Sequence, residues 1–246
     1  MEILYNGDCL EYIKYLPDNY IDLILQDPPY NKTKCKWDWN ILSEIDEFWY
    51  EWKRIIKRNG VIAITASQPF SSKLVCSNLD MFKYEWVWVK EKGTGFAFSR
   101  KQPLRRTEYV MVFYEHQPTY HYQGDKLEHP RTHVLPIVKS ESGGITKDNV
   151  NEDGSRINIE YTHKTKDNVI LIPRDRSNRG VHPTQKPEAL MAYLIETYTN
   201  PGDMVFDGFM GSGTTNVAAK KLGRNSIGCE ISEEYFNMAV DRIYAV

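Results

Sequence analysis

The chain lacks the features that would place it in a membrane or in an oxidising compartment. No apolar run approaches the ~20 residues that a membrane-spanning helix needs. The start, Met-Glu-Ile-Leu-Tyr, has neither a basic region nor a signal-like apolar stretch. The four cysteines are scattered and form no Cys-x-x-Cys pair, which is typical of reduced thiols rather than of a disulfide framework or a metal site. We therefore expect a cytoplasmic protein without a bound metal.

The chain also lacks a strong charge of either sign. Its formal net charge is −2, which argues against a protein that binds nucleic acid over its whole surface. Residues 100–179 carry 14 Lys and Arg against 11 Asp and Glu, a net +3, and the remainder is net −5. A locally positive middle is compatible with phosphate contact through one face. A segment of this charge is more often an ordinary solvated surface.

Two blocks of alternating strand and helix patterns flank an irregular middle. Residues 116–175 lose the periodicity, and 139–168 are rich in Ser, Gly, Asn, Asp, Lys and Thr. Asn59-Gly60 is predicted to end a helix, and residues 91–106 are predicted to form a loop. Apolar spacing predicts strands over 2–5, 21–25, 61–65, 84–90, 107–115, 204–206 and 225–229, and helices over 8–15, 43–57, 69–78, 187–199, 214–222 and 233–244.

This order of elements predicts an α/β fold with an insertion. The two blocks should share one doubly wound sheet, mostly parallel and covered by helices on both faces. We expect residues 1–115 to form its N-terminal half and 181–246 its C-terminal half. Residues 116–180 are expected to form an inserted surface of short strands and long loops, such as a recognition region.

Residues 27–30, Asp-Pro-Pro-Tyr, come just behind the apolar strand 21–25. The two prolines fix φ at about −65° and donate no backbone hydrogen bond, and Pro28 keeps Asp27 out of the helical region. The Asp27 carboxylate and the carbonyls behind it should form an arc of acceptors beside Tyr30. Such an arc suits a planar group with an NH2, such as the exocyclic amine of a nucleobase. Pro-Pro is also a common stop signal after a strand, so this motif alone leaves both interpretations open.

Residues 204–215, Met-Val-Phe-Asp-Gly-Phe-Met-Gly-Ser-Gly-Thr-Thr, predict a strand, a glycine-rich turn and the start of a helix. Glycines let the backbone approach a ligand closely, and a helix N-terminus offers N–H groups to an anion. The spacing fits neither the Walker pattern nor Gly-x-Gly-x-x-Gly. Glu230 ends the next strand, where a doubly wound fold holds ribose hydroxyls. A ligand with a ribose and a carboxylate but no phosphates fits S-adenosylmethionine.

Together these motifs resemble the DNA amino-methyltransferases of the permuted β class, in the N-4/N-6 DNA methylase family. In that family the Asp-Pro-Pro-Tyr block comes first, the target-recognition region lies between, and the cofactor turn comes last, as here. Asn-Gly-Asp-Cys at 6–9 and His-Pro-Thr-Gln-Lys-Pro at 182–187 are also characteristic. The resemblance covers roughly 1–115 and 180–246. One local departure is Gly208, where the family more often has Pro.

The resemblance implies the Rossmann-like fold of S-adenosylmethionine-dependent methyltransferases and a site shared by the two blocks. The implied catalytic residues are Asp27, Pro28, Pro29 and Tyr30. Asp8 is implied at the adenine amine of the cofactor, Glu230 at its ribose and Lys186 near its carboxylate. Asp8 could instead only cap a helix, and Lys186 could be a solvated lysine. The full set implied to bind the cofactor is Asp8, Cys9, Asp27, Thr184, Lys186, Asp207, Phe209, Gly211, Ser212, Gly213, Thr214 and Glu230.

The implied reaction is direct methylation of an exocyclic amine in double-stranded DNA, on a base flipped out of the duplex. Asp27 favours N6 of adenine over N4 of cytosine, because the cytosine enzymes more often carry Ser at that position. An alternative of a different class is a non-catalytic DNA-binding module that retains the cofactor pocket. The expected setting is a prokaryotic or phage-infected cell. A homodimer and a cognate restriction enzyme are further candidate partners.

Basic residues near both blocks are candidate DNA contacts. Clustered Arg can hold phosphates or read guanine edges, and we expect phosphate contact here. A plain solvated loop is the alternative at both places. The candidates are Lys32 and Lys34 behind the tetrapeptide, and the denser cluster Arg100, Lys101, Arg105 and Arg106.

Overall fold

The computed structural model describes residues 1–30, 40–124, 126–134, 158–164, 166–174 and 185–246. They divide into two compact units. Met1–His121 and Asn168–Val246 together form the larger unit, and Tyr122–Asp167 forms the smaller one. Both motif-bearing blocks therefore belong to one body although they are far apart in the sequence. The smaller unit covers fewer residues than the region 116–180 that is expected to recognise the target. Its role in target recognition stays a prediction.

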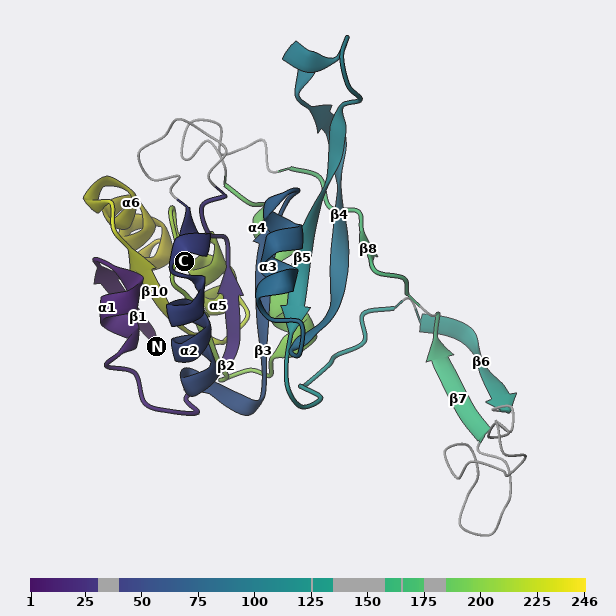
Figure 1. Cartoon of the computed structure of the whole chain (residues 1–246). Coiled ribbons are helices and arrows are strands. Elements are labelled where there is room, and N and C mark those ends of the chain that lie inside the picture. Colours follow the sequence, from purple (N-terminus) through teal and green to yellow (C-terminus); the bar gives the residue numbers. More distant parts are fainter. Residues whose placement is uncertain (31–39, 125, 135–157, 165, 175–184) are drawn as a thin grey trace, which may run out of the picture. The chain divides into compact units, whose positions relative to one another are not determined.

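One eight-stranded sheet forms the centre of the larger unit, in the order β1-β10-β9-β2-β3-β5-β4-β8 (Figure 1). Only the pairs β3–β5 and β5–β4 among these described strands are antiparallel, so the predicted mostly parallel sheet is confirmed. The strands are β1 Glu2–Asn6, β2 Ile21–Gln26, β3 Ile56–Ala66, β4 Phe82–Thr94, β5 Arg105–Phe113, β8 Val169–Ile170, β9 Met204–Asp207 and β10 Asn225–Glu230.

Helices cover both faces of this sheet (Figure 1). Ile24 of β2 packs with α1, α2 and α3 on one face, and Leu25 packs with α4 and α5 on the other. Successive strand residues point to opposite faces, which explains why β2, β9 and the Val61–Ala66 part of β3 are mostly apolar. The helices are α1 Cys9–Ile13, α2 Ile45–Ile55, α3 Phe70–Ser77, α4 Glu188–Tyr198, α5 Thr214–Lys221 and α6 Glu233–Tyr244.

The chain changes direction across the sheet between β2 and β9, which are parallel neighbours. α2 connects β2 to β3 on one face, whereas α5 connects β9 to β10 on the other. At such a switch point the loops that leave two neighbouring strands diverge, and a crevice forms outside their carboxyl ends. The tetrapeptide 27–30 follows β2 and the glycine turn follows β9, so the fold brings both motifs to this crevice.

Two local predictions are wrong. Asn59-Gly60 does not end a helix, because α2 stops at Ile55 and the chain pairs with β2 from Ile56 onward. Residues 91–106 are not simply a loop: β4 and β5 continue into a long antiparallel hairpin that extends past the other strands in Figure 1. A short 3-10 helix, η2 Phe96–Phe98, lies at its tip. The polar run Lys90–Gly93 hides this strand from apolar patterning. Lys90 is buried, but Glu91 and Lys92 are exposed, so strand pairing with β5 and not an apolar core extends the strand.

The smaller unit contains an antiparallel pair, β6 Lys126–Val134 and β7 Asn158–His163, with an irregularity in register between Lys126 and Arg131. None of the helices in the described ranges combines the length and the apolar character that crossing a membrane requires.

Candidate active site

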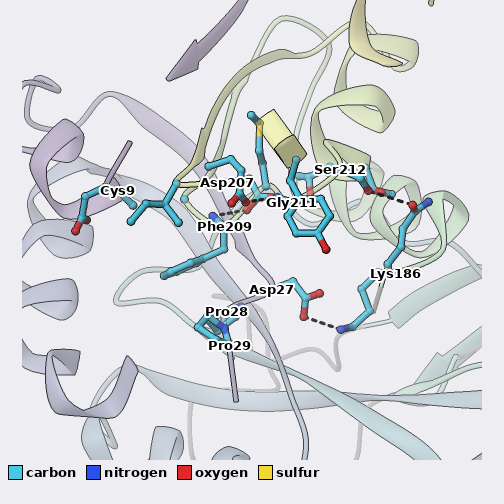
Figure 2. A pocket seen from close by; sticks show the side chains of 18 of the residues that line it. Cys9, Asp27, Pro28, Pro29, Lys186, Asp207, Phe209, Gly211 and Ser212 are labelled. Atoms are coloured by element: carbon cyan, nitrogen blue, oxygen red, sulfur yellow. Dashed lines mark hydrogen bonds and ion pairs between the residues drawn. The ribbon is translucent and has the colours of Figure 1, made fainter. Parts of the chain in front are cut away.

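A cavity of about 310 Å³ lies at the crevice between β2 and β9 (Figure 2). This volume is at the lower end of the range of small-molecule pockets. Most of the site residues predicted from the sequence line this cavity, although they come from five separate stretches of chain. They are Asp8, Cys9, Asp27, Pro28, Pro29, Tyr30, Lys186, Asp207, Phe209, Gly211, Ser212, Thr214 and Glu230.

The carboxylate of Asp27 is held through one of its two oxygens. Oδ1 accepts hydrogen bonds from the Tyr30 hydroxyl at 2.9 Å, from the Lys186 ammonium at 2.6 Å and from the Thr65 hydroxyl. Oδ2 accepts no hydrogen bond from the residues that the structure describes. Burial raises the pKa of Tyr30 well above its ordinary value, and the charges of Asp27 and Glu108 add to this effect. Tyr30 therefore keeps its proton and donates it toward Asp27.

Gln26, at the end of β2, links the two motifs. Its buried side chain donates from Nε2 to the carbonyl of Phe206 at 3.1 Å and accepts at Oε1 from the backbone N–H of Gly208 at 2.9 Å. A buried amide that satisfies two backbone groups is costly to replace, because each group would lose its partner. Gln26 thus fixes the glycine turn relative to the tetrapeptide.

Gly208 is explained by its neighbours. A Cβ at this position would lie 2.3 Å from the Cys9 sulfur and 3.1 Å from the Gln26 oxygen. Proline would add this clash and would also remove the N–H that Gln26 accepts. The departure from the usual family residue therefore fits the particular pair, Cys9 and Gln26, that surrounds the turn here.

Asp207 lies at the end of β9 and is only 3% exposed. It accepts the backbone N–H of Phe209 at 3.0 Å. Burial raises the pKa of Asp207 to about 7; bonds from Thr215 and Phe209 oppose the rise, and the charges of Asp27 and Glu230 add to it. No described residue forms an ion pair with Asp207, so a cationic ligand group would find an uncompensated carboxylate there.

Glu230 and Asp8 line the cavity next to the glycine turn. Glu230 accepts the backbone N–H of Gly211 at 2.9 Å and of Ser232 at 2.8 Å. Burial raises the pKa of Glu230, and these backbone bonds oppose the rise. Asp8 caps α1 by accepting the N–H of Leu10 at 2.8 Å. The helix-cap interpretation of Asp8 is therefore confirmed, and the same residue also borders the cavity.

Two predicted cofactor residues stand apart from this set. Thr184 lies outside the described residues. Gly213 precedes α5 with φ of +77°, and a Cβ there would lie 2.9 Å from the Cβ of Ala239. Gly213 is absent from the cavity lining, and the structure explains it by the left-handed turn and the close packing of α6.

The site also contains polar residues for which the sequence motifs predict no role, among them Gln185 of the His-Pro-Thr-Gln-Lys-Pro block. Thr65 reaches Asp27 from the end of β3, and Gln185 accepts the Ser212 hydroxyl at 3.1 Å. The Nε2 of Gln185 is buried without a hydrogen-bond partner among the described residues. Glu108 on β5 faces Lys186 at 3.6 Å. Gln26 and Thr65 are polar side chains inside apolar strand patterns, and this is the sequence signal that could have pointed to these two residues.

The predicted DNA contacts have different surroundings. Arg100, Lys101 and Arg105 are exposed at the β4–β5 hairpin. Arg106 is also exposed, but its guanidinium donates to the backbone carbonyls of Lys90 at 3.2 Å and Glu91 at 3.5 Å. Lys32 and Lys34 lie outside the described residues.

The chemistry of the cavity fits S-adenosylmethionine. The lining offers carboxylates for an ammonium group and for ribose hydroxyls. The Gln185 amide, whose Nε2 has no hydrogen-bond partner in the described part of the chain, can donate to a carboxylate. The ring of Phe209 adds an apolar surface that packs against Phe48, with centroids 5.5 Å apart. Each polar part of the cofactor thus has a complementary group in the lining.

Comparisons with known proteins agree with this site. A model of the DNA methylase family matches residues 21–241. The Type II methyltransferase M1.MboII of Moraxella bovis is 30% identical over 249 residues, which cover 96% of this chain and 94% of that protein. The crystal structure of the M1.HpyAVI complex with S-adenosylmethionine is 26% identical, with a TM-score of 0.64 and coverage of 98% of this chain and 100% of that one.

A further crystal structure, of the cytosine-N4-specific PvuII DNA methyltransferase, has a TM-score of 0.69 at 17% identity, covering 98% of this chain and 86% of that one. At this identity the likeness concerns the fold alone. The doubly wound fold predicted from the sequence is confirmed by these structures. Since the family model spans most of the sequence, the chain belongs to the N6/N4 DNA methylase family and is a DNA methyltransferase that uses S-adenosylmethionine.

Proposed function

We propose that this chain methylates the N6 amine of adenine at a specific site in double-stranded DNA, in the cytoplasm of a prokaryotic or phage-infected cell. The adenine amine is a poor nucleophile, because its lone pair is delocalised into the ring. Acceptors that take both N–H hydrogens localise this lone pair. Asp27 and the carbonyl of Pro28 are the acceptors that the tetrapeptide supplies, and Asp27 also stabilises the positive charge that develops on the nitrogen.

The hydrogen bonds of the Asp27 carboxylate are the observation that supports this proposal. Three donors engage Oδ1, and no described residue engages Oδ2. The carboxylate is therefore preorganised with one oxygen left for a substrate N–H. Asp27 lines the same cavity as Asp207 and Glu230, so amine and methyl donor would meet in one place, and such alignment lowers the barrier. S-Adenosylmethionine supplies the electrophilic methyl group on its sulfonium sulfur.

The cofactor contacts are assigned by the chemistry of each residue. Asp207 is proposed to receive the ammonium group and Glu230 the ribose hydroxyls. Asp8 is proposed to receive the adenine amine, beside the backbone of Cys9. Residues of the turn, Phe209, Gly211, Ser212 and Thr214, are proposed to surround the methionine part.

The target base must leave the duplex to reach Asp27. Tyr30 is the ring that we propose to contact the flipped base, while Pro28 and Pro29 hold it beside the carboxylate. One side of the Tyr30 ring stacks on Phe70, with centroids 5.0 Å apart. This support makes Tyr30 a rigid edge of the pocket, which favours stacking over an adaptable contact.

The β4–β5 hairpin is the proposed DNA-contacting element. Its tip exposes 81% of Phe96 and 55% of Phe98, close in sequence to Arg100, Lys101 and Arg105. Positive side chains bind phosphates, and exposed aromatic rings stack on bases. Exposed apolar rings are unfavourable in water and often mark an interaction site. A tip that combines such rings with positive side chains is therefore suited to DNA.

Two further assignments remain proposals. Arg106, Lys32 and Lys34 are proposed to add phosphate contacts. A homodimer and a partner restriction enzyme are proposed as associates, the latter because M1.MboII is named a Type II methyltransferase.

The test is methyl transfer from labelled S-adenosylmethionine to genomic DNA, followed by nucleoside analysis. Label in N6-methyldeoxyadenosine is the expected result. Label in N4-methylcytosine would overturn the base assignment, and DNA binding without transfer would favour a non-catalytic module. Sequencing of the modified positions would identify the recognition site.

A further inference from the structure

Four charged side chains form a continuous chain behind the tetrapeptide. The ammonium of Lys186 lies 2.6 Å from Asp27 Oδ1 and 3.6 Å from Glu108 Oε2, and the ammonium of Lys90 binds Glu108 Oε1. The four residues come from β4, β5, the end of β2 and the segment before α4. Figure 2 shows Asp27 and Lys186 directed toward one another. Positive and negative groups alternate along this chain, so it is neutral when every member is ionised.

The two lysines are almost fully buried, with 8% of Lys186 and 4% of Lys90 exposed. A buried ammonium is costly unless it is paired. Burial lowers the pKa of Lys186, but the charges of Asp27 and Glu108 outweigh it and raise the pKa above its ordinary value. Burial also lowers the pKa of Lys90, where Glu108 opposes the fall and the charges of Arg174 and Lys186 deepen it. Lys186 therefore depends on both carboxylates for its charged state.

Glu108 and Lys90 do not line the cavity, whereas Lys186 and Asp27 do. The charge of Glu108 raises the pKa of Tyr30, but among the described residues its contact with the cavity lining is the ion pair with Lys186. Any effect of Glu108 on the placement of Asp27 should therefore pass through Lys186. The ring of Tyr30 restricts the ammonium further, because its centroid lies 5.4 Å from Lys186 Nζ. With Glu108 on one side and Tyr30 on another, the ammonium is confined to the position where it engages Asp27 Oδ1.

We infer that Lys186 and Glu108 are positioning residues for Asp27 and not ligands of the cofactor. Lys186 occupies Oδ1 together with the two hydroxyls, which leaves Oδ2 as the oxygen that faces the target amine. Glu108 holds Lys186 in this place, and Lys90 neutralises Glu108. This inference rests on the proposed function, because it assigns Asp27 to the target amine. It differs from the role implied for Lys186 by the family resemblance, a contact to the cofactor carboxylate.

The variants Glu108→Gln and Lys186→Met test this arrangement, with Glu115→Gln as the matched control. Glu115 follows the same strand but is exposed and remote from the cavity. Misplacement of a reacting group by about 1 Å costs about 100-fold in rate. We therefore expect E108Q to lower kcat between about tenfold and 100-fold. The Kd of S-adenosylmethionine, measured by titration calorimetry, should stay at the wild-type value.

A double-variant cycle shows whether Glu108 acts through Lys186. Glu108→Gln should slow the Lys186→Met enzyme no further, since the residue through which it acts is gone. Independent, multiplicative losses would overturn the inference. So would a rise in the Kd of S-adenosylmethionine that matches the loss of kcat, because Lys186 would then belong to the cofactor site. Wild-type activity of E108Q would overturn it as well.

Unfolding temperatures and the retained cofactor affinity separate these effects from misfolding. The base that the wild-type enzyme methylates is identified first. If it methylates cytosine, the base assignment under Proposed function fails. The comparison of E108Q with wild type is still decisive in that case, since it measures how Asp27 is held and not which base it meets.

Discussion

Two aspartates at the switch point, Asp27 after β2 and Asp207 at the end of β9, are held in opposite ways. Asp27 is surrounded by side chains, among them the ammonium of Lys186 and the hydroxyls of Thr65 and Tyr30. Asp207 is supported by one backbone N–H and by the Thr215 side chain, neither of which carries a charge, and burial raises its pKa to about 7. Asp27 thus has a compensating charge in Lys186, whereas no residue in the described ranges supplies one for Asp207.

This difference separates two tasks at adjacent strand ends. A group that positions a target amine must be oriented before the substrate arrives, and a network of side chains provides that orientation. A group that receives a positively charged ligand gains more from the interaction if its own charge is uncompensated beforehand. The following substitutions disrupt each side of the comparison in turn.

Replacement of Asp27 has the largest expected effect. Asp27→Ala should lower methyl transfer by about 100- to 1,000-fold, the size of loss seen when an electrostatic group at the reacting centre is removed. Binding of S-adenosylmethionine, measured by calorimetry, should persist because Asp207 and Glu230 remain. Asp27→Asn is the matched control for size: it keeps an acceptor but loses the charge. Near-normal turnover in the alanine variant would contradict the proposed role of Asp27.

Gly208→Pro disrupts the link between the two sides. It removes the N–H that Gln26 accepts and places a Cβ against the Cys9 sulfur. An unsatisfied buried acceptor and an overpacked contact each cost about 1–3 kcal/mol, so we expect a loss of about 2–6 kcal/mol in the free energy of unfolding. Urea denaturation measures it.

Two control variants apportion this loss. Gly208→Ala keeps the N–H and adds only the Cβ, so it should cost less than proline. Combining it with Cys9→Ala should restore stability by removing the sulfur that the Cβ meets. Wild-type stability of the proline variant would show that the Gln26 bridge does not hold the turn.

The raised pKa of Asp207 predicts a pH dependence with a defined sign. Its native pKa lies above the ordinary 3.8, so its contribution to stability is present below about pH 4 and is lost as the pH rises to about 7. The upper limit of this loss is about 4 kcal/mol. Affinity for the cationic cofactor should move in the other direction, since the ionised carboxylate binds it better. Between pH 5.5 and 7.5 we expect an increase of about tenfold or more.

Asp207→Asn should remove both pH dependences. Its cofactor affinity should be low and flat across this range, and its unfolding free energy should lose the decline between pH 4 and 7. Calorimetric titrations at several pH values measure the cofactor affinity, and denaturation curves at the same pH values measure the unfolding free energy. If cofactor affinity and unfolding free energy change with pH in the variant as they do in the wild type, the titrating group is another one, such as Glu230.

The sequence predicted the backbone-dominated side of the site better than the side-chain network. Gly211, Phe209 and Glu230 follow from a strand–turn–helix pattern, because local chain geometry dictates where they lie. Glu108 and Thr65 could not be predicted, since they reach Asp27 and Lys186 only when β3 and β5 pair in the sheet. The hairpin beyond Lys90 was missed for a related reason: strand pairing orders it without an apolar pattern.

The smallest expected effect concerns the hairpin and sharpens the contrast between charge and stacking. Each phosphate contact contributes about 0.9 to the slope of log K against log salt, so Arg100→Ala with Lys101→Ala should reduce that slope by about 2. Phe96→Ala should weaken binding about equally at every salt concentration, because stacking releases no counterions.

Arg106→Ala should change the slope less than Arg105→Ala, since the Arg106 guanidinium is bound to the backbone of β4. Fluorescence anisotropy with duplex DNA from 50 to 200 mM salt, the range over which phosphate contacts are usually compared, separates these cases. A slope that none of the basic variants changes would place the phosphate contacts elsewhere on the protein.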